Sequence, residues 1–122
     1  MKRVLVVDDQ EGMREMIADF LTIIGLEACT VDGAEAALGV LDRGESVDLV
    51  ITDLHMPVTD GLELMDEIHR RWEDLPVVVI TGYGTFRTER QVLESGAAGF
   101  IAKPCTLHRV QETVQAALGI AP

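Results

Sequence analysis

Five polar side chains stand at the ends of short apolar segments in this sequence. They are Asp8, Asp9, Asp53, Thr81 and Lys103. If a fold brings the ends of these segments together, three carboxylates, one hydroxyl and one ammonium group share one crevice. Three carboxylates within a few ångströms of one another repel strongly, and a hard divalent cation is the simplest remedy.

Such a set of side chains is suited to phosphoryl transfer. Magnesium fits the carboxylates because it prefers oxygen ligands and keeps water molecules that a phosphate oxygen can replace. A cation of this kind would offset the charge that develops during transfer. Asp53 would then be the nucleophile that forms an acyl phosphate, while the Thr81 hydroxyl and the Lys103 ammonium group bind phosphoryl oxygens.

The apolar segments that carry these residues alternate with longer segments of helical periodicity. We predict strands over residues 3–8, 27–31, 47–52, 76–81 and 99–103. Such alternation is typical of a parallel sheet with helices on both faces. The predicted fold is therefore α/β, a doubly wound, five-stranded parallel sheet in the flavodoxin-like order 2-1-3-4-5, forming one domain over residues 1–122. In such sheets ligands bind beyond the carboxyl ends of the strands, where the five polar groups stand.

The helices between the strands have their own signals. Apolar residues recur at three- and four-residue spacing over residues 13–24, and Gly25 follows as a stop signal. A polar fourth helix is expected over about residues 86–95, and a fifth over residues 107–118. The segment "GYG" (82–84) is predicted to be a mobile loop before the fourth helix.

The second and third helices each begin with a capping-box pattern. The pairs are Asp32 with Glu35 and Asp60 with Glu63, each with the spacing of an N-cap residue and its N3 partner. We therefore expect both aspartates to cap their helices. Gly61 then falls in the first turn of the third helix.

Composition limits the partners of the chain. Ten Lys plus Arg stand against 21 Asp plus Glu, and the formal net charge of -11 disfavours direct contact with nucleic acid or anionic lipid. No apolar run approaches the roughly 20 residues of a membrane span, so we expect a cytoplasmic protein. Cys29 and Cys105 lie outside any CxxC spacing and are expected to be reduced packing thiols. A protein partner fits this composition best.

Four motifs in this chain resemble the signature set of bacterial response-regulator receiver domains. They are "VVDDQ" (6–10), "DLHMPVTDG" (53–61), "ITGYG" (80–84) and "GFIAKP" (99–104). They occur in the order and at the separations of that family, and the likeness covers essentially the whole chain. The resemblance implies a phosphoacceptor domain of two-component signalling.

The resemblance also implies a role for each matching residue. Asp8, Asp9 and Asp53, together with the backbone carbonyl of His55, match the ligands of a magnesium ion, and Asp53 matches the phosphorylated aspartate. Lys103 matches the lysine that pairs with the phosphoryl group. Thr81 matches the switch hydroxyl, and Phe100 matches the switch aromatic. Lys103–Pro104 matches a peptide bond that is usually cis.

These roles imply a signalling cycle rather than turnover of an external substrate. The chain is expected to take a phosphoryl group from a histidine kinase or phosphotransfer protein. The change is then expected to reach the surface of the fourth helix, fifth strand and fifth helix, which controls a downstream protein or a covalently linked output domain. The chain would catalyse only its own phosphorylation and dephosphorylation.

Two other functions are compatible with the same fold. An FMN or nucleotide binder would need small hydroxyl residues and glycines after the first strand, where this chain has "DDQEG" (8–12). A phosphohydrolase would typically place an acid/base aspartate two residues after its nucleophile, where this chain has His55. A receiver that only docks is a further possibility, although every matched group is present. His55, His69 and His108 show no metal-ligand spacing and are expected to be surface residues.

Overall fold

Five parallel strands form one sheet in the order β2-β1-β3-β4-β5 in the computed structural model, which describes residues 1–82 and 86–120. The strands are β1 (Arg3–Val7), β2 (Glu27–Val31), β3 (Leu49–Asp53), β4 (Val77–Thr81) and β5 (Gly99–Ala102). The predicted fold class and strand order are therefore confirmed. The strand boundaries differ from the prediction by at most two residues, and Asp53 is the last residue of β3 rather than the residue after it.

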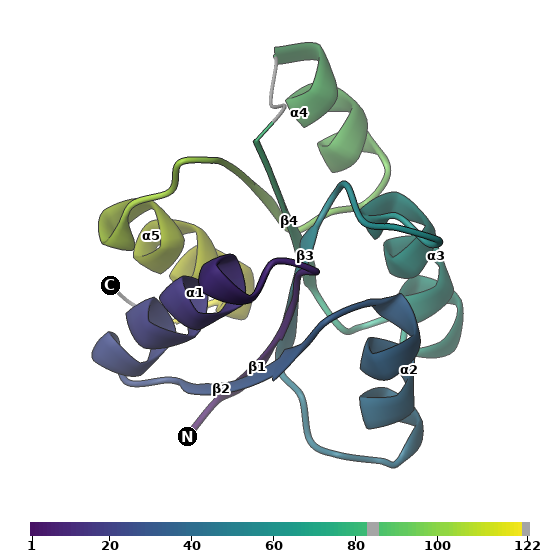
Figure 1. Ribbon diagram of the computed structural model, residues 1–122, viewed down its shortest axis with the longest axis horizontal. Helices are drawn as coiled ribbons and strands as arrows, with labels where there is room; N and C mark the ends of the chain where they lie inside the picture. Colours follow the sequence, from purple (N-terminus) through teal and green to yellow (C-terminus); the bar gives the residue numbers. More distant parts are fainter. Residues whose placement is uncertain (83–85, 121–122) are drawn as a thin grey trace.

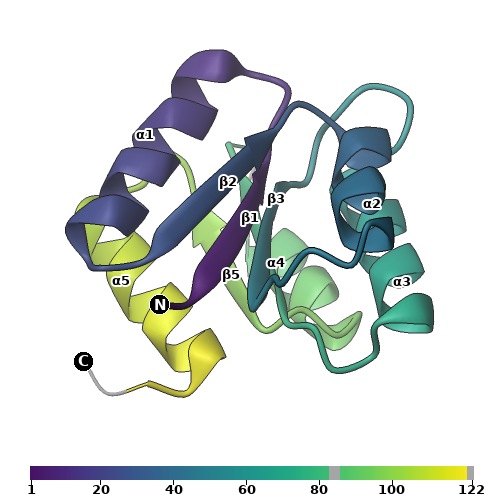
Figure 2. The ribbon, with the colours of Figure 1, turned by 90° about the horizontal axis from the view of Figure 1, so that it is seen from below.

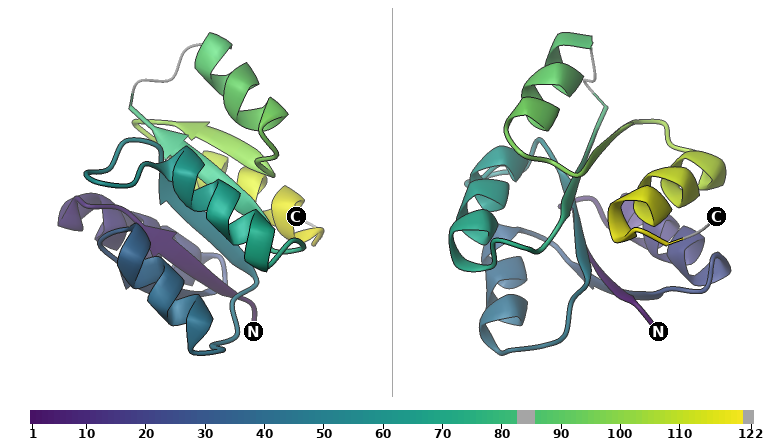
Figure 3. Two further views of the ribbon diagram at one scale, coloured as in Figure 1. Left: turned by 90° about the vertical axis from the view of Figure 1, so that its right-hand side faces the viewer. Right: turned by 180° about the vertical axis from the view of Figure 1, so that it is seen from behind.

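The helices cover both faces of the sheet (Figures 1 and 3). They are α1 (Glu11–Ile23), α2 (Ala34–Asp42), α3 (Gly61–Arg71), α4 (Phe86–Glu94) and α5 (Leu107–Leu118). Helices α1 and α5 lie together on one face, while α2, α3 and α4 lie on the other. The N-terminus lies beside the start of β1, away from the carboxyl ends of the strands (Figure 2).

The central strands are buried because helices cover both of their faces. Every residue of β3 and β4 is buried, and in β1 only Arg3 is partly accessible. This burial explains why these segments are almost continuously apolar. Strand β2 is an edge strand, and its residues are exposed or half-buried.

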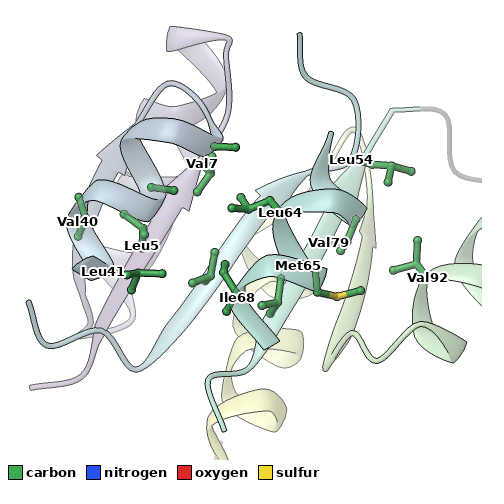
Figure 4. Close-up of a cluster of buried hydrophobic side chains, with 14 of the residues drawn as sticks. Leu5, Val7, Val40, Leu41, Leu54, Leu64, Met65, Ile68, Val79 and Val92 are labelled. Atoms are coloured by element: carbon green, nitrogen blue, oxygen red, sulfur yellow. The ribbon is translucent and has the colours of Figure 1, made fainter. Parts of the chain in front are cut away.

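Side-chain alternation along the strands separates the core into two layers. One layer, shown in Figure 4, joins Leu5 and Val7 of β1 to Leu64 and Ile68 of α3. The other lies beneath α1 and α5 and includes the alternate β1 residues together with apolar residues of both helices: Val4, Val6, Ile17, Leu21, Val110 and Val114. The two layers therefore pack against both faces of the sheet and leave its strand ends to carry the polar side chains.

Only one of the two predicted capping boxes forms. At α3, Asp60 accepts from the backbone N–H of Glu63 at 2.9 Å, and the Glu63 side chain accepts in return from the backbone N–H of Asp60. At α2 the prediction is wrong, because the helix begins one residue later and its N-cap is Gly33, which makes no side-chain cap. Burial decides which side of α2 faces inward and where the helix starts. Its buried residues are Ala34, Ala37, Val40 and Leu41.

Several smaller expectations can be compared with the structure. Gly25 has φ 86° directly after α1, as expected of a helix stop. Cys29 and Cys105 are free thiols, the second of them buried. The "GYG" segment falls mostly on residues 83–85, outside the described residues. Within residues 1–82 and 86–120, no helix combines the length and apolar character that a membrane crossing needs.

Candidate functional site

Three carboxylates meet at the carboxyl ends of β1 and β3, which are neighbours in the sheet. Val7 pairs with Thr52 in the strand register, so Asp8 and Asp53, one residue further on, lie side by side. One oxygen atom from each of Asp8, Asp9 and Asp53 lies within 4.8 Å of the others. The predicted cluster of three carboxylates is therefore present.

The two inner carboxylates are removed from solvent. Asp8 is fully buried and Asp53 is 5% exposed, whereas Asp9 is exposed. Each inner carboxylate accepts a backbone hydrogen bond two residues on, Asp8 from the N–H of Gln10 at 2.9 Å and Asp53 from the N–H of His55 at 3.2 Å. Loss of solvation raises the pKa of Asp8 and the negative charge of Asp53 raises it further, against the opposing effects of the Gln10 N–H and Lys103.

Lys103 places its positively charged ammonium group between the two inner carboxylates. Its Nζ lies 3.2 Å from Oδ2 of Asp53 and 3.4 Å from Oδ2 of Asp8. Burial lowers the pKa of Lys103, but the attraction of Asp53 and Asp8 outweighs it and the pKa is raised overall. The backbone N–H of Lys103 donates to the Thr81 carbonyl at 2.8 Å, and the Lys103–Pro104 peptide bond is cis, as the resemblance implied.

Thr81 and Phe100 lie on the other face of the sheet from the charged groups. Thr81 ends β4 and is fully buried, and Phe100 in β5 is 7% exposed. Because alternate residues share a face of a strand, Thr81 is on the face of Val79, which pairs with Phe100 in the register and belongs to the same core layer. Asp53 shares the opposite face with Ile51. Any coupling between Asp53 and Phe100 must therefore act through the strand ends.

The loop from β3 to α3 is packed directly against the backbone of Asp53. Gly61, the first residue of α3, donates its N–H to the Leu54 carbonyl at 2.8 Å. A Cβ atom at Gly61 would lie 2.4 Å from the carbonyl oxygen of Asp53, closer than any stable contact. Glycine is therefore required for α3 to begin beside the site.

The side chains of the three histidines are not among the possible cation ligands that the described residues bring together. The His55 side chain and the His108 side chain are exposed, as expected. His69 differs from the prediction because it is half-buried, with its ring near Gly96 at the end of α4. None of the three belongs to the carboxylate cluster that the described residues contain.

Arg14 is a residue near the site that the sequence alone does not reveal. Its Nη1 donates to the backbone carbonyl oxygen of Asp8 at 2.8 Å, so it touches the loop that carries the acidic pair. The only signal in the sequence is a basic residue one turn into a helix that follows that pair. Such a residue is ordinarily a solvated surface group, and only the tertiary structure shows where its side chain goes.

The donor set has the chemistry of a hard-cation site. The three side chains that could bind an ion, Asp8, Asp9 and Asp53, are all carboxylates, which suit magnesium and calcium better than the softer transition metals. Two of them are buried and one is exposed, so a cation bound there would keep contact with water on one side. The residues present therefore fit the magnesium ion that the sequence implies.

Comparison with known proteins identifies relatives along the whole chain. The family model of the response regulator receiver domain matches residues 4–115. The response regulator protein FleR of Pseudomonas aeruginosa is 40% identical over 98% of this chain, which spans 25% of FleR. The chain also spans about a quarter of two further curated relatives, the C4-dicarboxylate transport regulatory protein DctD and the response regulator PilR of the same organism.

Solved structures extend the likeness to three dimensions. The crystal structure of the receiver domain of NtrX from Brucella abortus is 36% identical, with a TM-score of 0.86, and the match covers 97% of this chain and 99% of the other. A response regulator receiver domain protein from Clostridium thermocellum is 27% identical with a TM-score of 0.89, covering 98% and 95% of the two chains. Sequence and structure therefore point to the same relatives.

Proposed function

Because the chain belongs to the response regulator receiver domain family, we propose that Asp53 accepts a phosphoryl group from a histidine kinase or phosphotransfer protein. The observation that carries the proposal is the position of Asp53. Its carboxylate is almost buried, lies 3.2 Å from the Lys103 ammonium group and belongs to a cluster with Asp8 and Asp9. A buried carboxylate with these neighbours is arranged for chemistry rather than for solvation.

In the proposed reaction a carboxylate oxygen of Asp53 attacks the phosphorus atom of a phosphohistidine. An O–P bond forms, the P–N bond breaks, and the histidine nitrogen keeps the electron pair and takes up a proton from solvent. Lys103 can turn from the two carboxylates toward the new phosphoryl oxygens, because its ammonium group already lies within 3.4 Å of both sites of negative charge. Thr81 ends β4 on the opposite face of the sheet, so we propose that its hydroxyl turns across the strand end to donate to a second phosphoryl oxygen.

Magnesium is part of the proposal. Asp8, Asp9 and Asp53, with the backbone carbonyl of His55, would hold the ion at the carboxylate cluster. When bound, the ion supplies positive charge that offsets the charge of the acceptor and of the phosphoryl group. The buried position of Asp8 favours such a ligand, because ionised Asp8 is otherwise poorly solvated.

The same proposal assigns no external substrate to the chain. We infer that it catalyses only its own phosphorylation and dephosphorylation, in the cytoplasm, and that it passes the signal to a partner protein or linked output domain through the surface of α4, β5 and α5. An FMN or nucleotide site after β1 is not favoured, because Asp8 and Asp9 occupy that loop and would repel a phosphate.

Phosphorylation of purified protein tests the assignment of Asp53. Incubation with acetyl phosphate and Mg²⁺ should add one phosphoryl group, measured by intact mass, and excess EDTA should abolish the addition. The Asp53→Asn variant should remain unmodified. Asp32→Asn is the matched control, because Asp32 follows β2 at the same end of the sheet but is exposed and outside the carboxylate cluster. Unchanged labelling of Asp53→Asn would contradict the proposal.

A further inference from the structure

Arg14 links α1 to the loop that carries Asp8 and Asp9. Its Nη1 donates to the backbone carbonyl oxygen of Asp8 at 2.8 Å, across six residues of sequence. Helical side chains lean toward the N-terminus of their helix, and this direction takes the guanidinium group back over the start of α1 to the end of β1. The hydrogen bond therefore closes the loop between β1 and α1.

Among the described residues, the other contacts of this loop include the ion pair between Lys103 Nζ and Asp8 Oδ2 at 3.4 Å. The backbone N–H of Asp8 donates to the Val31 carbonyl at 3.2 Å, and the Asp8 carboxylate accepts from the N–H of Gln10 at 2.9 Å. Gln10 is the N-cap of α1, and its side chain makes no capping hydrogen bond. Asp9 is exposed, so its position depends on the backbone around it. The Arg14 side chain, which extends from α1, donates a hydrogen bond to that backbone.

We propose that Arg14 is a positioning residue for the cation site, and that its bond to the Asp8 carbonyl holds Asp8 and Asp9 where both carboxylates can share one ion. The inference rests on the proposed function. The bond goes to the main chain, so it leaves the carboxylate oxygens open to a cation. A guanidinium group suits this task because it is always charged and its donors have a fixed planar geometry.

The two effects that Arg14 can have on a cation have opposite signs. A positive side chain near the site repels the ion, so removal of the charge alone would strengthen Mg²⁺ binding. Loss of the positioning bond would weaken Mg²⁺ binding, and removal of a group that orients a metal ligand typically costs about 10- to 100-fold in metal affinity. The direction of the change therefore separates positioning from simple electrostatics.

The experiment compares Arg14→Met and Arg14→Lys with the wild-type chain. Mg²⁺ is titrated while the backbone amide signals of residues 8–10 are followed by NMR, and thermal unfolding is recorded in EDTA and in Mg²⁺. We expect Arg14→Met to raise the Kd for Mg²⁺ by about 10-fold or more. The rise in Tm that Mg²⁺ produces should shrink accordingly, because stabilisation by a ligand depends on its concentration relative to Kd. Arg14→Lys can still donate to a carbonyl and should recover part of the affinity.

Arg109→Met is the matched control. Arg109 also donates from its guanidinium group to a backbone carbonyl, that of Phe100 at 3.2 Å, and this bond joins α5 to β5 rather than holding the acidic loop. Its loss should lower Tm equally with and without Mg²⁺ and leave the Kd for Mg²⁺ unchanged.

Two results would overturn the role of Arg14. One is an Arg14→Met variant that binds Mg²⁺ as tightly as wild type or more tightly. The other is a variant that is less stable in EDTA but gains the same increment in Tm from Mg²⁺. A wild-type chain that shows no Mg²⁺ binding would overturn the cation site itself and this role with it. The outcomes for wild type and variant therefore distinguish the two failures.

Discussion

At the scale of single residues, the site holds two carboxylates that are largely removed from solvent, those of Asp8 and Asp53. Asp8 is fully buried beside Asp53, and Lys103 is the only described cation that pairs with the two of them. One ammonium group cannot neutralise two carboxylates and the nearby Asp9. The side chains therefore leave a net negative charge at the site, and this charge favours the binding of a cation.

The raised pKa of Asp8 predicts how stability depends on pH. Burial, and then the charge of Asp53, raises this pKa in the folded chain above its ordinary value of 3.8. The folded chain therefore binds this proton more tightly than the unfolded chain. As pH rises from about 3.8 through the raised folded pKa, Asp8 progressively lowers the free energy of unfolding, and the penalty is complete once the pH exceeds that folded pKa.

Asp8→Asn tests this dependence in EDTA. Asparagine keeps an oxygen that can accept from the Gln10 N–H but carries no charge, so we expect the variant to be more stable than wild type at pH 7 by urea unfolding. The difference should diminish as pH falls through the raised folded pKa toward 3.8, because Asp8 in the folded chain then becomes protonated. Asp9→Asn is the control, because the exposed Asp9 carboxylate keeps its water and should have a smaller effect. A less stable Asp8→Asn variant at pH 7 would mean that the ion pair with Lys103 outweighs the burial of charge.

At the scale of secondary structure, caps and close contacts set where each element begins beside the site. Helix α3 starts with a complete capping box and with Gly61 against the backbone of Asp53. Helix α2 has Gly33 as its N-cap, in an extended conformation and without a side-chain cap. Asp32 and Glu35 nevertheless have the spacing of a capping box there. The two helix starts therefore look alike in sequence and differ in structure.

The capping difference predicts unequal effects of equivalent substitutions. Asp60→Ala removes a hydrogen bond to the Glu63 N–H and should lower the free energy of unfolding by about 0.5–2 kcal/mol. Asp32→Ala removes no capping bond and should change it by less than about 0.5 kcal/mol. Urea unfolding of both variants supplies the measurement. Equal losses would show that Asp32 caps α2 in solution.

At the scale of the whole molecule, the sheet connects the carboxylate cluster to the face formed by α4, β5 and α5. Thr81 ends β4, the strand next to the one that carries Asp53, and Phe100 in the adjacent β5 is buried in the same core layer as Val92 of α4. We propose that phosphorylation draws Thr81 toward a phosphoryl oxygen and lets Phe100 rotate into the space it leaves. Couplings of this kind are typically about 1–3 kcal/mol, so phosphorylation should enrich a conformation that the unmodified chain already samples.

Beryllofluoride, which mimics a phosphoryl group, tests this coupling by NMR. In wild type it should shift the backbone amide signals around Asp53 and also those of residues 86–110. In Thr81→Ala the changes near Asp53 should persist and those over residues 86–110 should weaken, because the hydroxyl that responds to the phosphoryl group is missing. Distant changes of wild-type size in Thr81→Ala would show that Thr81 is not the relay.

The sequence by itself determined the order of the strands and the identity of the main site residues. Apolar runs of strand length alternating with helical segments leave few topologies in which both faces of a parallel sheet are covered. In such a sheet the residues at the strand ends must converge, so the positions of Asp8, Asp53 and Lys103 along the chain suffice to group them at one site. These features depend on short-range patterns and on a general rule of topology.

The tertiary structure alone decided the details that depend on packing. The start of α2 follows from the burial of Ala34 and Ala37 against the sheet, which places the N-cap at Gly33 whatever capping pattern precedes it. The half-burial of His69 depends on the approach of the end of α4, and the bond from Arg14 to Asp8 depends on how α1 lies across the end of β1. The contacts of His69 and Arg14 join different elements of the fold. The start of α2 is a choice between two local alternatives of similar free energy. Local signals are worth about 1 kcal/mol, and the burial of several apolar side chains outweighs them.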